Sequence, residues 1–254
     1  MAKAAKTPAK KTPPKKKAPV KPKRSFFWWI GVVPFLAIRW GIRAIVAVAV
    51  LVVLWVALYT VVNPPSTIFI MQEVSRLDET RREWRDFETI SSHMPHAIVA
   101  AEDANFCNHW GFDMAAIRDA LEDGGGRGAS TISQQTVKNV FLWHGRNWTR
   151  KAMEAAITPV MEAFWSKRRI LEVYMNVAEF DEGIFGVGAA APWYFGVDAA
   201  DLSPRQAARL AAILPSPKTR SAKNPSNFVQ RRARSIASGA ATIRADGRNA
   251  CFHG

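Results

Sequence analysis

Acidic residues are absent from the first 62 positions of this 254-residue chain, although twelve lysines and arginines lie there. The formal net charge of +14 therefore arises mostly from this stretch. Residues 63–254 carry only +2, because the remaining 23 of the 35 basic residues face all 21 acidic ones. This distribution argues against a nucleic-acid-binding surface on the globular part, and we expect no nucleic-acid partner.

Cysteine is nearly absent as well. The two cysteines, Cys107 and Cys251, belong to no metal-ligand spacing. A disulfide between them is possible in an oxidising compartment, and two unpaired thiols agree with the sequence equally well. Strand signals are few and no internal repeat is present, which argues against β-rich and solenoid architectures.

The N-terminal part has the pattern of a membrane anchor. Residues 1–25 are rich in Lys, Ala, Pro and Thr, which predicts a disordered basic tail that could contact anionic lipid headgroups. Within residues 26–64, the stretch 44–62 has nineteen residues without a charge, enough to cross most of a bilayer core. We expect one transmembrane helix, spanning about residues 42–62. The basic flank predicts a cytoplasmic N-terminus and a periplasmic domain over residues 65–254.

A second apolar run covers residues 26–38 and has tryptophans near its ends. It is short for a separate span, so it is either an interfacial segment or an extension of the anchor. If it crossed the membrane separately, residues 65–254 would lie on the opposite side.

The 190 residues after the anchor suit one domain, and their hydrophobic periodicity is mostly helical. Glycine-rich stretches at 124–126 and 183–188 predict loops. We expect a mostly α fold, with helices over residues 115–121, 130–141, 148–164, 167–176 and 204–214.

Four short polar motifs lie between positions 102 and 176 and bring carboxylates together with basic and amide side chains. They read Glu102-Asp103-x-x-Phe106-x-x-His109-x-Gly111, Gly128-x-Ser130-Thr131-Ile132-x-Gln134-Gln135-x-x-Lys138-Asn139, Arg150-Lys151-x-x-Glu154, and Lys167-x-x-Ile170-Leu171-Glu172-x-Tyr174-x-Asn176.

The second motif predicts a helix that begins near Thr131, because Thr131 and Gln134 have the spacing of a capping box. Gln134 and Lys138 share one face of that helix, and a helix N-terminus with amides and a lysine favours an anion. In the third motif, a plain surface ion pair between Arg150 and Glu154 would contribute under about 1 kcal/mol. Pro159 should kink the following helix or start a new one.

Together the motifs resemble those of the peptidoglycan glycosyltransferases, the family-51 enzymes that polymerise lipid II. The resemblance extends from about Ile98 to Arg232 and includes Leu210-Ala-Ala-Ile-Leu-Pro-Ser-Pro217 and Asn224-Pro225. It implies a lysozyme-like, mostly helical glycosyltransferase domain with a membrane-dipping "jaw". No Ser-x-x-Lys or Lys-Thr-Gly is present, so the monofunctional biosynthetic members match better than those with a penicillin-binding transpeptidase.

The resemblance also implies roles. Glu102 would be the general base on the acceptor hydroxyl, and Glu154 would assist the leaving group or orient the cations. Lys138, Arg146 and Lys151 would stabilise a leaving pyrophosphate. The remaining candidate substrate-binding residues are Asp103, Phe106, His109, Ser130, Thr131, Gln134, Gln135, Asn139 and Arg150. Lys167, Glu172, Tyr174 and Asn176 resemble scaffold residues.

The implied partners are lipid II, the nascent glycan strand, membrane lipid and other cell-wall synthesis proteins. No cofactor is expected to be required, although a divalent cation (Mg²⁺ or Mn²⁺) could bridge pyrophosphate. On sequence alone the apolar stretch 140–143 is either a membrane-facing lip or a helix end buried in the core, and the jaw that the resemblance implies in this region leads us to predict the lip. Two other functions fit less well: a lysozyme-like hydrolase or lytic transglycosylase, which needs no pyrophosphate site, and a non-enzymatic scaffold for cell-wall machinery.

Overall fold

The computed structural model describes residues 26–124, 128–145 and 147–253, and its side chains from Pro34 onward. The chain divides into two compact units, residues 1–50 and 51–254. The helices are α1 (Phe26–Leu58), α2 (Ile68–Arg76), α3 (His93–Glu102), α4 (Met114–Glu122), α5 (Ile132–Phe141), α6 (Trp148–Phe164), α7 (Lys167–Val177), α8 (Gly186–Phe195), α9 (Pro204–Ile213) and α10 (Asn227–Ala245), with 3-10 turns η1 (Phe87–Thr89), η2 (Phe106–Asn108) and η3 (Ala199–Asp201).

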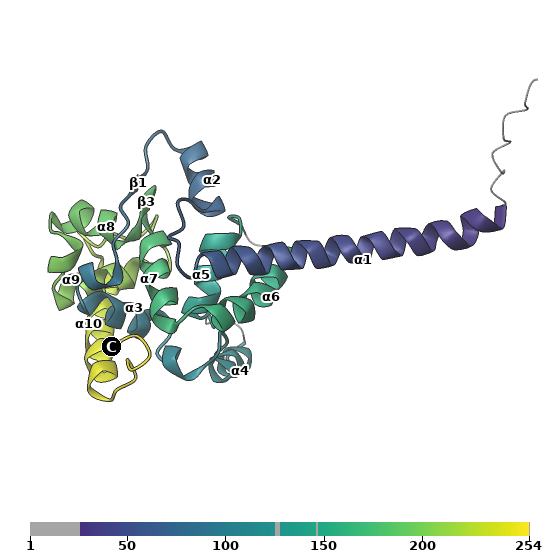
Figure 1. Ribbon diagram of the computed structural model, residues 1–254. Helices are drawn as coiled ribbons and strands as arrows, with labels where there is room; N and C mark the ends of the chain where they lie inside the picture. The colour runs from purple at the N-terminus through teal and green to yellow at the C-terminus, as the bar shows by residue number, and fades with distance from the viewer. Residues whose placement is uncertain (1–25, 125–127, 146, 254) are drawn as a thin grey trace, which may run out of the picture. The chain divides into compact units, whose positions relative to one another are not determined.

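The anchor is one continuous helix, α1, so the two apolar runs of the sequence do not form separate spans (Figure 1). The stretch Pro34–Leu58 is long and apolar enough to cross a membrane. The helix ends at Leu58, four residues before the end that the uncharged run predicted, because the turn at residues 59–62 leads into Pro64 and Pro65. This helix is consistent with a membrane anchor.

The last turns of α1 belong to the second unit and enter its core. Val56 is fully buried, and its carbonyl oxygen accepts a hydrogen bond from Trp165 Nε1 at 2.8 Å. Trp55 and Tyr59 pack against Phe141, with ring centroids 5.1 and 6.0 Å from it. The prediction that residues 140–143 form an exposed membrane-facing lip is therefore wrong for residues 140–142, which are buried as the alternative proposed.

The second unit is mostly helical, as predicted, and its helices form two groups. In the first, α3 packs against α9 and α10, and in the second α5 packs against α6 and α7. A small sheet has the order β1-β3-β2, built from β1 (Arg81–Arg82), β3 (Ile184–Phe185) and β2 (Glu179–Asp181). Its β1 and β3 strands are parallel, and β2 and β3 are antiparallel.

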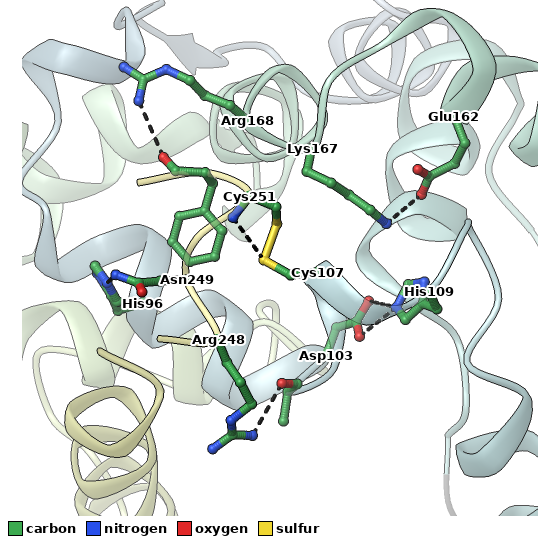
Figure 2. Close-up of a disulfide and its surroundings, with 12 residues drawn as sticks. His96, Asp103, Cys107, His109, Glu162, Lys167, Arg168, Arg248, Asn249 and Cys251 are labelled. Atoms are coloured by element: carbon green, nitrogen blue, oxygen red, sulfur yellow. Dashed lines mark hydrogen bonds and ion pairs between the residues drawn. A yellow bond between two sulfur atoms is a disulfide. The ribbon is translucent and has the colours of Figure 1, made fainter. Parts of the chain in front are cut away.

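Helix boundaries follow local sequence chemistry. Thr131 and Gln134 form the predicted capping box at the start of α5, and Asn147 caps α6 by accepting a hydrogen bond from Arg150 N. Pro159 lies inside α6 and does not end it, contrary to one of the two outcomes that the sequence suggested. The two cysteines form a disulfide, Cys107–Cys251, which settles the question that the sequence left open (Figure 2).

Candidate active site

Glu102 ends α3 at the boundary between the two helix groups. Its Oε2 accepts a hydrogen bond from Gln135 Nε2 at 3.0 Å. Its Oε1 is buried and has no hydrogen-bond partner among the described residues, with the Arg232 guanidinium 3.7 Å away. Burial raises the pKa of Glu102 above its usual value, and the Gln135 hydrogen bond and the charge of Arg232 oppose that rise. The site thus holds a carboxylate with one oxygen fixed and the other available.

The amide of Gln135 is oriented by groups on both sides. Tyr174 on α7 donates its hydroxyl proton to Gln135 Oε1 at 3.1 Å, so the amide nitrogen faces Glu102. The same nitrogen also lies 3.4 Å from the carbonyl oxygen of Ser130. Tyr174 is buried, and its role is to hold Gln135, as its interpretation as a scaffold residue predicted.

The second carboxylate, Glu154 on α6, is buried and fully engaged by cations. Its Oε2 accepts a hydrogen bond from Arg150 Nη1 at 2.9 Å, and its Oε1 pairs with Lys151. Arg150 is buried as well, and its Nε donates to the carbonyl of Gly145 at 2.7 Å. The Lys151 ammonium also reaches Ser130 Oγ at 3.2 Å. Glu154 therefore orients two cations and is not a free acid or base.

Lys138 on α5 interacts electrostatically with both carboxylates, Glu154 and Glu102. Desolvation lowers its pKa, the charges of Glu154 and Glu102 oppose this, and Arg150 and Lys151 reinforce it. Lys138 and Arg150 also line an open cleft of about 470 Å³. Its other walls come from the segments around Phe69, Trp143–Gly145, Glu179 and Leu214–Thr219. A cleft lined by an enclosed lysine and a buried arginine suits an anionic group.

Asp103, His109 and Thr131, from the first two motifs, form hydrogen bonds that fix the N-terminus of α5. Asp103 is buried, and its Oδ2 accepts hydrogen bonds from Ile132 N at 3.0 Å and from His109 Nε2 at 3.1 Å. Thr131, also buried, donates its hydroxyl proton to Gly111 O at 2.7 Å. A carboxylate at the N-terminus of a helix satisfies its free N–H groups. These contacts favour a structural role over the predicted substrate contact.

Gly111 is a position where only glycine fits. Its φ is +87°, and an added Cβ would lie 2.7 Å from the Thr158 side chain. Gln134 is likewise committed to the capping box, since its Oε1 accepts from Thr131 N at 3.1 Å. The candidate assignments of Thr131 and Gln134 to substrate binding therefore give way to a role in fixing the loop.

Phe106 is fully buried and packs beside His109 and Phe252, with the Lys167 ammonium 4.5 Å from its ring centroid. It belongs to the core, contrary to its assignment as a substrate-binding residue. His109 and Lys167, which lie beside its ring, pair with Asp103 and Glu162 respectively, and Figure 2 shows both pairs. His109 Nδ1 is buried without a hydrogen-bond partner among the described residues.

The other candidates differ in accessibility. Ser130 reaches the site through Lys151, whereas Asn139 is buried on α5. Arg146 lies outside the described residues. In the fourth motif, Glu172 accepts from Phe87 N at 3.0 Å, and Asn176 binds both backbone groups of Arg85. Both therefore act as scaffold, as predicted.

Sequence reasoning missed two cations. Arg232 contacts Glu102 from α10, and Lys218 lines the cleft while pairing with Glu73 at 3.0 Å and Glu179 at 3.5 Å. The available signal was compositional, because residues 204–245 contain nine Lys or Arg and no Asp or Glu.

The described residues contain no group of three or more His, Cys, Asp and Glu side chains that could hold a metal ion. Both carboxylate oxygens of Glu154 already form ion pairs, Oε2 with Arg150 and Oε1 with Lys151. This donor set does not fit a divalent metal at Glu154.

Comparison with known proteins agrees with this geometry. The family model described as "Transglycosylase" matches residues 70–240, two thirds of the chain. The chain belongs to the transglycosylase family. Family membership makes the protein a glycosyltransferase, and Glu102, Gln135, Lys138 and Glu154 all lie inside the matched range.

Three similar curated proteins carry the name "Biosynthetic peptidoglycan transglycosylase". The one from Jannaschia sp. (strain CCS1) is 59% identical over 214 residues, which are 84% of this chain and 90% of that protein. The one from Xanthomonas oryzae pv. oryzae is 48% identical over 206 residues, 77% of this chain and 84% of that protein. The one from Pseudomonas putida (strain F1) is 55% identical over 159 residues, 61% and 67% respectively.

Proposed function

We propose that this protein is a peptidoglycan glycosyltransferase that polymerises lipid II into β-1,4-linked glycan strands and releases undecaprenyl pyrophosphate. The names of the similar proteins support the peptidoglycan substrate. The observation that carries the proposal is the carboxylate of Glu102, whose Oε1 is buried and lacks a hydrogen-bond partner among the described residues. A general base needs an oxygen that no other donor already occupies, so that it can take the proton that it removes.

In the acceptor step, Glu102 Oε1 takes the proton from the 4-hydroxyl of the acceptor sugar. The hydroxyl oxygen then forms a bond to the anomeric carbon of the donor sugar, and the bond from that carbon to the pyrophosphate oxygen breaks. Attack from the face opposite the leaving group inverts the α-linked donor to a β-1,4 bond. Gln135 keeps Glu102 in place, and burial raises the pKa of Glu102, which makes its carboxylate a stronger base.

The leaving pyrophosphate gains negative charge as its bond breaks, so cations in a desolvated site stabilise the transition state. Lys138 and Arg150 line the cleft, and Lys151 lies beside Ser130. Glu154 holds Arg150 and Lys151 in position. We also assign Arg146 to this group from the sequence motif.

The anchor keeps the enzyme beside a lipid-linked substrate. The twelve positive charges within residues 1–43, with no acidic residue among them, support a cytoplasmic N-terminus and a catalytic unit on the periplasmic side of the inner membrane. Its partners are lipid II, the growing glycan strand and membrane lipid, together with other proteins of cell-wall synthesis.

The test is polymerisation of purified lipid II by the full chain in detergent. Glu102→Gln keeps the size of the side chain and removes the base, so we expect polymerisation to fall at least about a hundredfold. Glu122→Gln is the matched control, because Glu122 is exposed on α4, and we expect near-normal turnover. Near-normal turnover in the Glu102 variant would overturn the mechanism, and cleavage of finished peptidoglycan without polymerisation would indicate a hydrolase.

A further inference from the structure

The segment from α9 to α10 has a charge unlike the rest of the catalytic unit. Residues 204–245 carry nine Lys or Arg and no Asp or Glu, whereas residues 63–254 as a whole carry only +2. The two helices pack closely against each other and against α3. A strong excess of one sign on one part of a nearly neutral domain creates a local field that attracts oppositely charged ligands.

Three arginines of this segment line one groove between the two helices. The groove has a volume of about 470 Å³, and its lining includes Arg205 and Arg209 of α9 and Arg234 and Gln230 of α10. None of these arginines has a carboxylate within 4.0 Å among the described residues. A smaller cavity of about 60 Å³, which Arg244 lines, shares two wall residues with the groove.

Three other cations of the same segment have partners. Arg232 contacts Glu102, Lys218 pairs with two glutamates, and Arg220 donates to Ala212 O at 3.2 Å. The groove arginines differ from these three cations in having guanidinium groups available, and they are the ones that gather in a single groove. Arginine presents a planar fork of donors that matches a carboxylate.

The position of the groove favours the enzyme's own substrate over the membrane surface. The last turns of α1 pack against Phe141 of α5 and against Trp165, which follows α6. In Figure 1 the helices α9 and α10 lie apart from that end of α1. Arg232 and Arg234 are two residues apart, so they point roughly 200° apart around α10. Arg232 faces Glu102, and Arg234 faces the groove.

We infer that the α9–α10 groove binds the carboxylates of the peptide branch that the peptidoglycan substrate carries, and so increases affinity for the substrate held at Glu102. This inference rests on the proposed function. The peptide has to pass around the outside of α10, and the shorter arc between the two arginines, about 160° of a circle about 10–12 Å across, is about 14–17 Å long. An extended peptide spans about 3.3–3.6 Å per residue, so a branch of about five residues is long enough to follow this arc from the reacting sugar to the groove.

The experiment compares two triple variants of the full chain in detergent. Arg205→Gln, Arg209→Gln and Arg234→Gln together remove the groove charges. Arg118→Gln, Lys223→Gln and Arg231→Gln form the control, because they remove three charges from residues that do not line the groove. Binding is measured with a soluble peptidoglycan disaccharide-peptide, in one form with free carboxylates and in another with those carboxylates amidated. Polymerisation is measured with lipid II in the same two forms.

We expect the wild type and the control to prefer the free-carboxylate form by about tenfold, in Kd for the fragment and in KM for lipid II. The groove variant should show a preference near one, with kcat within about twofold of the wild type. Exposed ion pairs contribute modestly and are screened by salt, so the preference should shrink above about 0.15 M salt.

Each other outcome has a distinct meaning. If the groove variant keeps the preference of the control, the inference is overturned. If it keeps the preference but loses binding to vesicles of anionic phospholipid, the groove contacts the membrane, which also overturns the inference. If the wild type binds the fragment with the expected preference yet makes no polymer from either form of lipid II, the proposed function fails and the groove assignment stands.

Discussion

Removing the disulfide should lower thermal stability strongly and leave catalysis nearly intact. Cys107 lies in η2, five residues after Glu102, and Cys251 lies in the tail after α10. The tail keeps other attachments when the disulfide is absent. Arg248 Nη1 donates to Ala104 O at 3.3 Å. Arg168 Nη1 donates to the carbonyl of Phe252 at 3.2 Å (Figure 2).

The magnitude follows from the length of the loop that the disulfide closes. The cysteines are 144 residues apart in sequence. The loss of chain entropy in the unfolded state then corresponds to about 5 kcal/mol at 25 °C. For a unit of about 200 residues, 1 kcal/mol shifts Tm by about 2–4 °C, so we expect Tm to fall by about 10–20 °C.

The assay uses the full chain with Cys107→Ser and Cys251→Ser together, in detergent. Tm is measured by near-ultraviolet circular dichroism, and lipid II polymerisation is measured at 25 °C. The reductant-treated wild type should match the variant, and reductant should not change the variant further. A fall in Tm below about 3 °C would refute the entropic argument. A large loss of kcat with unchanged Tm would show that the disulfide holds the catalytic loop instead.

Three further predictions concern single residues and one concerns topology. The charge of Arg232 lowers the pKa of Glu102, so Arg232→Gln should raise that pKa further. Because the base must be deprotonated, kcat/KM should then begin to fall at a higher pH as the solution is acidified. An unchanged pH profile of kcat/KM would contradict this. Lys138→Gln should reduce kcat about 10²–10³-fold with little change in Tm, and near-normal kcat would remove Lys138 from the leaving-group site. Phe141→Ala should destabilise the catalytic unit by about 3–5 kcal/mol in denaturant titration, whereas weaker vesicle binding at unchanged stability would restore the membrane-lip interpretation. A C-terminal fusion should give a signal with a reporter that works only in the periplasm and none with a reporter that works only in the cytoplasm. The opposite result would reverse the assigned orientation.

Local sequence chemistry alone determined the anchor and five of the other helices, α4, α5, α6, α7 and α9. The loop predicted over residues 183–188 is wrong, because residues 184–185 form β3 by pairing with distant strands and α8 begins at Gly186. The capping box at Thr131 and Gln134 involves residues three apart, and the structure confirms it. The predicted helices over residues 148–164 and 167–176 agree with α6 and α7 to within one residue. Such features depend on propensity, periodicity and capping within a few turns, so they can be predicted from neighbouring residues in the sequence.

The motif residues were identifiable from sequence, but their individual roles were not. Asp103 and Phe106 stand in the same motif as Glu102, yet one caps α5 and the other packs in the core. Adjacent positions on a chain can point to solvent, to a helix end or to the core, and only the packing of α3 against its neighbours decides which.

Contacts between distant segments were decided by the tertiary structure alone. Arg232 reaches Glu102 across 130 positions of sequence, and Cys107 pairs with Cys251 across 144. Residues 140–142 of the apolar stretch became core because Trp55 in the last turns of α1 and Tyr59 just after α1 cover Phe141. An apolar run in the sequence predicts that its side chains are buried away from water, and only the folded chain determines whether protein or lipid covers them.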